Sequence, residues 1–167
     1  MTVPDILLLI VAAAAAAGLL GVLGLLVAHR LARKPGRAAV QPIAADQVIR
    51  YFKRKAAFKV TVTAQTPLPP AEIFIRLAYE PYLSRLPFLS GPLWLDDERR
   101  VGSRRTFSGT FYSVSEQVVS VVEDREITLV GTAVCTPWTI KNFAERFVIS
   151  PTDVDGVHLV DWTNAGT

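Results

Sequence analysis

The hydrophobic positions of the chain follow two patterns, one unbroken and one alternating. The unbroken run covers residues 6–28, ILLLIVAAAAAAGLLGVLGLLVA, and contains neither a charged residue nor a proline. A helix of these 23 residues, rising about 1.5 Å per residue, covers the roughly 30 Å hydrocarbon core of a bilayer. The run therefore predicts a transmembrane helix over about residues 6–28.

A cleaved secretory signal is the alternative for the same run. Secretory signals begin with a basic segment and have an apolar stretch of about 7–15 residues. Here Asp5 is the only charged side chain before the run, and the run is longer than that. We therefore interpret it as a retained anchor.

The alternating pattern begins at Phe58. Phe58, Val60 and Val62 alternate with polar residues, as in a strand with one buried face. Prolines end this strand near residue 67 and open a short helix with an apolar stripe over 73–78, and a second short turn covers 82–86. Strand-like segments then follow near residues 93–97, 103–109, 112–123, 126–136, 139–150 and 157–164. This order predicts an α+β fold with an antiparallel meander.

Charge divides the chain into three parts, namely an anchor segment at 1–28, a basic juxtamembrane linker at 29–57, and a domain at 58–167. Between residues 29 and 59, nine basic residues oppose Asp46 alone, a net charge of +8, whereas residues 60–167 carry a net charge of −4. Basic residues beside a span stay in the cytoplasm, so the N-terminus is expected outside and the domain inside. The basic segment is either a topology signal or a collar that binds anionic lipids. A nucleic-acid-binding domain is not expected, because the basic surface lies outside the folded part.

Side chains for metal or nucleophilic chemistry are few. The chain has two histidines, His29 and His158, and the single Cys135, which is interpreted as a small core residue. We therefore expect no metal site, no cofactor and no assigned catalytic residue. Glu145 and Arg146 are neighbours on a strand and point to opposite faces, so only one can face the interior, and we interpret both as solvated.

From residue 58 to 167 the chain resembles the START-related helix-grip superfamily, also called SRPBCC or polyketide cyclase/dehydrase-like. The resemblance is carried by four segments: PPAEIF at 69–74, VGSRR at 101–105, SEQVV at 115–119 and VHLVDW at 157–162. It implies a curved antiparallel sheet of about seven strands, two short helices after the first strand, and a cavity for apolar molecules under a long C-terminal helix. The given sequence stops at Thr167, within or just after the last strand, so we expect that helix to be missing through truncation.

The aromatic residues of the predicted strands are the candidate ligand contacts: Trp94, Phe107, Phe111, Trp138, Phe147 and Trp162. The first hypothesis is a membrane-tethered binding or carrier domain for a lipid, isoprenoid or polyketide-like molecule. One alternative is a cyclase/dehydrase-type enzyme that uses Glu116, Glu145 or His158 as acid or base. Another is a protein-interaction module whose interior is filled by side chains. The oligomeric state is left open.

Overall fold

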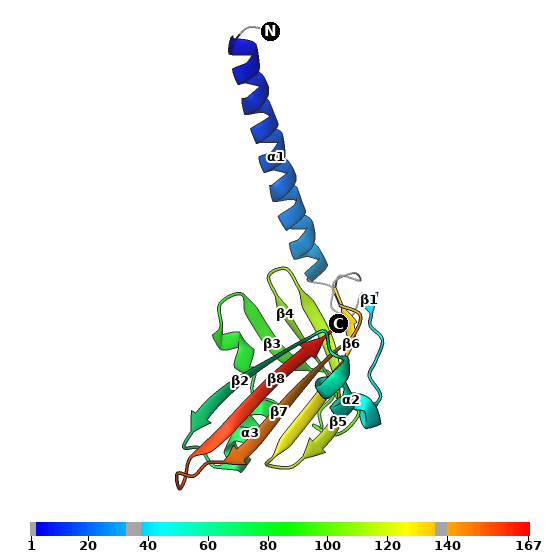
Figure 1. Ribbon diagram of the computed structural model, residues 1–167, viewed down its shortest axis with the longest axis vertical. Helices are drawn as coiled ribbons and strands as arrows, with labels where there is room; N and C mark the ends of the chain where they lie inside the picture. Colours follow the sequence, from blue (N-terminus) through cyan, green and yellow to red (C-terminus); the bar gives the residue numbers. More distant parts are fainter. Residues whose placement is uncertain (1–2, 33–37, 136–139) are drawn as a thin grey trace.

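The structure is a computed structural model that describes residues 3–32, 38–135 and 140–167. A long N-terminal helix precedes short helical turns and the strands of one sheet (Figure 1). The elements in chain order are α1 (Val3–Ala32), β1 (Ala38–Ala39), η1 (Ala45–Gln47), α2 (Val48–Arg50), η2 (Tyr51–Lys55), β2 (Phe58–Thr66), α3 (Pro70–Tyr79), η3 (Tyr82–Arg85), β3 (Leu89–Trp94), β4 (Arg104–Gly109), β5 (Ser113–Val122), β6 (Glu126–Val134), β7 (Phe143–Pro151) and β8 (His158–Gly166).

Strands β2 to β8 form a curled antiparallel sheet in the order β2-β8-β7-β6-β5-β4-β3. From β3 to β8 each strand pairs with the next along the chain, and β2 pairs with β8 from Phe58↔Gly166 to Thr66↔His158. The short β1 is added to β6. This confirms the predicted α+β meander of seven strands with two short helices, α3 and η3, after the first strand. β8 is the last element of the described residues.

The inner face of the sheet is the face that α3 covers. Pro70 stands in the first turn of α3, where its missing N–H costs nothing, and Glu72 favours the positive end of the helix dipole. The apolar stripe predicted from the sequence then faces the sheet. It packs on a buried cluster that includes Val118, Leu129 and Phe147.

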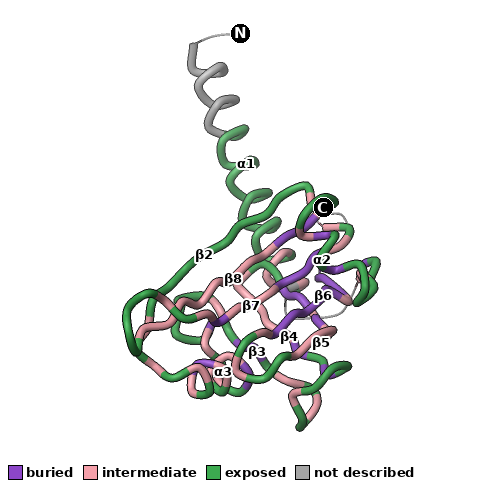
Figure 2. Tube along the Cα trace, turned by 60° about the horizontal axis from the view of Figure 1, so that its bottom comes forward, coloured by how far each residue is buried: buried purple, intermediate pink, exposed green. Residues whose placement is uncertain are grey.

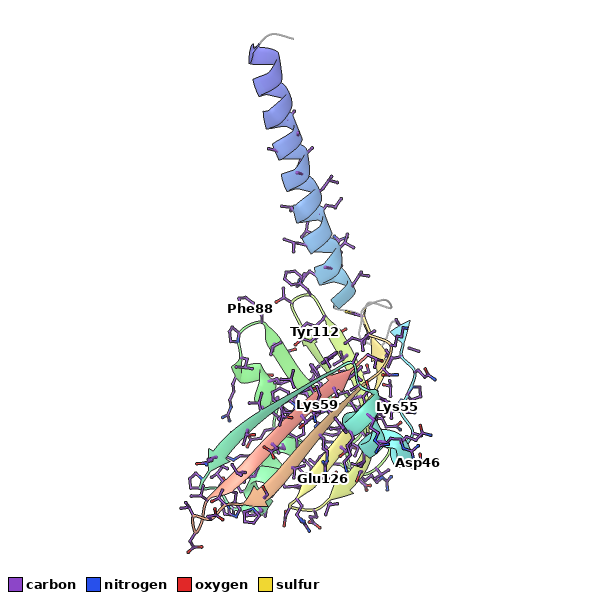
Figure 3. All side chains as sticks on the ribbon, viewed as in Figure 1. Asp46, Lys55, Lys59, Phe88, Tyr112 and Glu126 are labelled. Atoms are coloured by element: carbon purple, nitrogen blue, oxygen red, sulfur yellow. The ribbon has the colours of Figure 1, made fainter. Side chains whose placement is uncertain are left out.

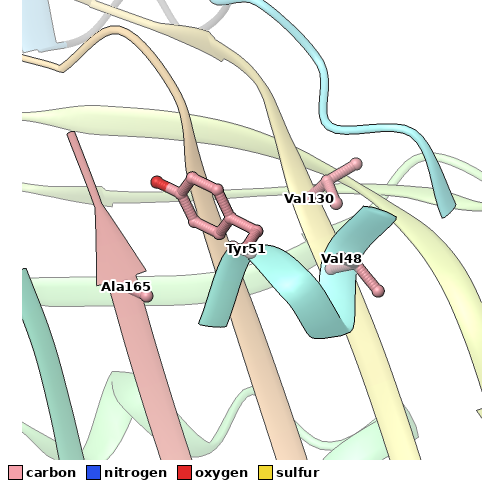
Figure 4. Packing of buried hydrophobic residues seen from close by; sticks show 5 residues of the cluster. Val48, Tyr51, Val130 and Ala165 are labelled. Carbon is pink, nitrogen blue, oxygen red and sulfur yellow. The ribbon is translucent and has the colours of Figure 1, made fainter. Parts of the chain in front are cut away.

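The outer face is covered by the short helical segments that precede β2. Val48 of α2 and Tyr51 of η2 are buried against Val130 of β6 and Ala165 of β8 (Figure 4). The Tyr51 hydroxyl donates a hydrogen bond to Oδ1 of Asn142 at 2.8 Å. Part of the segment expected to be a juxtamembrane linker is therefore packed on the domain.

Two strands differ from the sequence-based ranges. The third strand of the structure, β3, is Leu89–Trp94, whereas the sequence predicted a strand near 93–97. Gly91, with φ +104°, and Pro92 indicate a turn in the sequence, but a register shift between Ser90 and Leu93 accommodates both inside the strand. β7 begins at Phe143 rather than near 139, and residues 136–139 lie outside the described part of the chain.

Helix α1 extends away from the sheet (Figure 1). Residues Ala12–Leu31 are long and apolar enough to cross a membrane, and none of the apolar window is buried against the domain. A secretory signal near the N-terminus can pass the same test of length and hydropathy. The helix itself is therefore established, and its role is considered below with the function.

Candidate ligand-binding face

Strand register brings two groups of side chains together on the inner face. Residues paired across neighbouring antiparallel strands point to the same face of a sheet. Arg105 of β4 pairs with Glu116 of β5, and Glu145 of β7 lies two strands further along, beyond Leu129 of β6. On the same face, Trp94 of β3 pairs with Arg105, and Phe147 of β7 pairs with Trp162 of β8. The inner face therefore holds a charged group and an aromatic group side by side.

The charged group is a buried ion-pair triad of Arg105, Glu116 and Glu145, centred on Arg105. Its Nε lies 2.8 Å from Oε2 of Glu116, and its Nη2 forms an ion pair with Oε2 of Glu145. All three side chains are 1% exposed. Two further hydrogen bonds support the triad, because Arg105 Nη1 donates to the Tyr82 hydroxyl at 3.1 Å and Trp162 Nε1 donates to Glu145 Oε1 at 2.5 Å. The triad thus joins β4, β5, β7, β8 and η3.

Two carboxyl groups share one guanidinium in this triad, and the electrostatics follow from that imbalance. Burial, together with the charge of Glu116, raises the pKa of Glu145 to about 8. Burial opposes the charge of Arg105, but the two carboxyl groups outweigh it and raise its pKa. Burial also raises the pKa of the Tyr82 hydroxyl.

Trp94, Phe147 and Trp162 form an aromatic floor beside the triad. The rings of Phe147 and Trp162 are stacked, with centroids 5.7 Å apart and an interplanar angle of 11°. Tyr82 meets Phe147 edge to face at 5.8 Å. The guanidinium of Arg99 lies 4.6 Å from the ring centroid of Trp94, and that of Arg105 lies 5.5 Å from it. The floor is therefore held in place by both stacking and charge.

Strand β2 leaves this inner face open along one edge. Phe58, Val60 and Val62 point to the same face as Trp162, and they are 48%, 57% and 55% exposed. Figure 2 shows the contrast between the exposed β2 and the buried residues of the central strands. An exposed strip of large apolar side chains beside an aromatic floor is a surface that binds apolar molecules.

The six predicted ligand contacts lie in different places. Trp94, Phe147 and Trp162 meet on the aromatic floor. Phe107 packs in a separate cluster around Val114, and Phe111 lies not on a strand but in the β4–β5 connection, 47% exposed. Trp138 lies outside the described residues. Three of the six therefore share one surface.

The acid–base candidates are likewise divided. Glu116 and Glu145 are brought together by Arg105, whereas His158 lies at the far end of β8, where it lines a groove with Pro69, Pro70 and Pro151 among others. The interpretation of Glu145 as solvated is wrong, because it is buried and paired. Arg146 does point to the opposite face, as predicted, and forms an ion pair with Glu126 at 2.6 Å.

Two members of this site, Arg105 and Tyr82, were not recognised from the sequence. Arg105 follows Arg104, and strand alternation requires one of the two to face inward, as for Glu145 and Arg146. That alternation was the available signal for Arg105. Tyr82 lies in a short helical turn, where no periodic pattern predicts which face is buried. Among the described residues, no three His, Cys, Asp or Glu side chains lie close enough to hold a metal ion.

Comparisons with solved structures identify the fold. No protein-family model matches the chain, and no curated protein is significantly similar to it in sequence. Protein CV1439 from Chromobacterium violaceum superposes with a TM-score of 0.51 at 12% identity, over 65% of this chain and 78% of that one. CalU16 from Micromonospora echinospora gives 0.46 at 14% identity, over 65% of this chain. Ara h 8.0201 gives 0.49 at 11%, over 66% of this chain and 78% of that one.

The chain spans 60% of the length of CalU16. The structural neighbours are helix-grip proteins, and at these identities the likeness concerns the fold alone. The curled sheet therefore has the helix-grip fold that the sequence resemblance implied.

Proposed function

We propose that this chain is a membrane-tethered domain that binds or carries a hydrophobic small molecule on the inner face of its sheet. The observation that carries the proposal is the combination of an exposed apolar strip on β2 with the aromatic floor of Trp94, Phe147 and Trp162. The ligand class is a lipid, an isoprenoid or a polyketide-like molecule, because the contacts offered are aliphatic and aromatic.

The triad supports a binding role more than a catalytic one. A general acid or base must reach the substrate with a free oxygen or nitrogen. Here Glu116 is paired with Arg105, and Glu145 accepts from both Arg105 and Trp162. The triad therefore orients Trp162 and stiffens the floor beneath a ligand, and acid–base chemistry is not part of the proposal.

Helix α1 is the tether in this proposal. The uncharged run 6–28 covers a bilayer core at about 1.5 Å per residue, and none of the apolar window Ala12–Leu31 is buried against the domain. A domain held at the bilayer receives an apolar ligand without a passage through bulk water. That advantage follows from the very low solubility of such ligands.

The basic residues that follow α1 predict the orientation of the tether. We expect the N-terminus outside and the domain on the cytoplasmic side, because lysine and arginine beside a span are retained there. A topology reporter fused after Ser90 should be active only as a cytoplasmic reporter. Activity on the other side of the membrane would contradict the orientation, and N-terminal sequencing that finds cleavage near Ala28 would contradict the anchor.

Photo-crosslinking tests the binding face in the full chain. We expect a diazirine-bearing fatty acid, included in nanodiscs with the protein, to form adducts on peptides of β2 and β8 as well as on α1. The α1 adducts are an internal reference, because a spanning helix contacts every lipid. The β7–β8 connection at 152–157, at the opposite end of the sheet, is the control peptide. Adducts confined to α1 would contradict binding on the inner face.

A further inference from the structure

One end of the sheet lies directly beside the base of α1. His29, in the last turn of α1, donates a hydrogen bond from Nδ1 to the carbonyl oxygen of Thr110 at 2.9 Å. Thr110 belongs to the connection between β4 and β5. Leu89 pairs with Gly109, so Phe88 and Thr110 are the next residues beyond the last pair of β3 and β4. We call the connections 86–88 and 110–112 together the proximal rim.

The contact with His29 fixes the level of the proximal rim along the helix axis. The uncharged apolar run 6–28 ends at Ala28, and His29 is the next residue. If residues 6–28 fill the hydrocarbon core, Thr110 lies at the boundary between hydrocarbon and headgroups. The residues on either side of Thr110 are then at the same depth.

The side chains of the proximal rim are large, apolar and exposed. Phe88 is 80% exposed, and Leu86, Phe111 and Tyr112 are 50%, 47% and 42% exposed. Figure 3 shows Phe88 and Tyr112 at the end of the domain nearest α1. Aromatic side chains are enriched at the membrane–water boundary, where a ring sits among headgroups. Three aromatic residues and Leu86 at one end form a patch and not a scatter of single exposed residues.

Charge distinguishes the proximal rim from the opposite end of the sheet. The described connections on the α1 side, 86–88, 110–112 and 140–142, contain Lys141 and no acidic residue. The connections at the opposite end, 95–103, 123–125 and 152–157, hold seven acidic residues against three arginines, a net charge of −4. The acidic residues are Asp96, Asp97, Glu98, Glu123, Asp124, Asp153 and Asp155, and the arginines are Arg99, Arg100 and Arg125. An anionic lipid surface repels carboxylates, so only the α1 side is suited to contact with it.

We propose that the proximal rim inserts into the headgroup region of the bilayer that α1 spans, and so docks the sheet end-on against the membrane. This inference rests on the proposed tether. Phe58, the first residue of β2, lies at the same end, because it pairs with Gly166 and Gly166 pairs with Phe143. The exposed strip of Phe58, Val60 and Val62 therefore begins at the membrane surface. A lipid-dissolved ligand has a continuous apolar path from the bilayer to the inner face.

Site-specific fluorescence quenching tests the docking in the full chain. Single variants Phe88→Cys and Phe111→Cys carry an environment-sensitive NBD label. The protein is reconstituted into vesicles that contain anionic lipid and a lipid with a nitroxide near its headgroup, and in a parallel set a lipid with a nitroxide deep in its acyl chain. Val154→Cys is the matched control, because Val154 is an exposed apolar residue, 63% exposed, at the acidic end. Leu20→Cys reports the tether. The native Cys135 is 1% exposed, and the unsubstituted chain controls for its labelling.

The labels at 88 and 111 are expected to lose emission to the headgroup nitroxide and to shift to the blue, while the label at 154 does neither. Rim insertion by about 5–10 Å would place both labels near that nitroxide. Quenching at position 20 by a deep nitroxide without quenching at 88 and 111 would overturn the docking and leave the tether intact. Absence of deep quenching at position 20 would overturn the tether, and the docking with it.

Discussion

Replacing Arg105 by methionine is expected to destabilise the domain by about 3–5 kcal/mol, because it leaves two buried carboxyl groups without their cation. Methionine keeps an unbranched side chain in place of the aliphatic part of Arg105, so the substitution chiefly removes the charge. The measurement is the free energy of unfolding of the full chain in detergent, from urea titration followed by tryptophan fluorescence.

The neighbouring arginine supplies the control. Arg104 points to the outer face, and its ion pair with Asp96 at 3.8 Å is largely exposed, so Arg104→Met should cost less than about 1 kcal/mol. The combination Arg105→Met, Glu116→Leu and Glu145→Gln also removes the two carboxyl groups that the single variant leaves without a cation, and it should restore stability. The glutamine oxygen at position 145 remains as the acceptor for Trp162. Equal costs for Arg104→Met and Arg105→Met would contradict the role given to the triad.

Alternation along the chain was enough to predict β2 and the faces of its residues. Phe58, Val60 and Val62 do share the inner face, as the period of two requires. The range of β3 was not predictable in the same way, because Gly91 and Pro92 indicate a break and the sheet absorbs them in an irregular pairing. Local sequence signals therefore gave the strand pattern, and long-range pairing decided its limits.

The triad could not be predicted, because it depends on register between distant strands. Glu116 meets Arg105 only through the β4–β5 pairing, and two register shifts in the β5–β6 pairing set which residues lie beside β7. A shift of one residue would turn Glu145 to the outer face and Arg146 inward. Neither pairing can be read from the local sequence, so Glu145 was interpreted as solvated together with Arg146. The aromatic floor was predicted in part, since large aromatic residues on strands are buried wherever the register places them.

Replacing Val62 by aspartate is expected to lower ligand affinity by about tenfold or more. Val62 is 55% exposed on the inner face beside Trp162, and a ligand seated there would cover it. Covering a valine side chain contributes about 1.5–3 kcal/mol, and a buried unpaired carboxylate adds a further cost. Thr61→Asp is the matched control, because Thr61 precedes Val62 on the same exposed strand and points to the outer face.

The most direct test of binding on the inner face is native mass spectrometry of the full chain released from detergent, with the ligand carried from the expressing cells. The proposal predicts an additional mass of one hydrophobic small molecule on the unsubstituted chain and on Thr61→Asp, and its loss from Val62→Asp. A chain that carries no additional mass, or the same mass on both variants, would contradict the binding of an apolar ligand on the inner face.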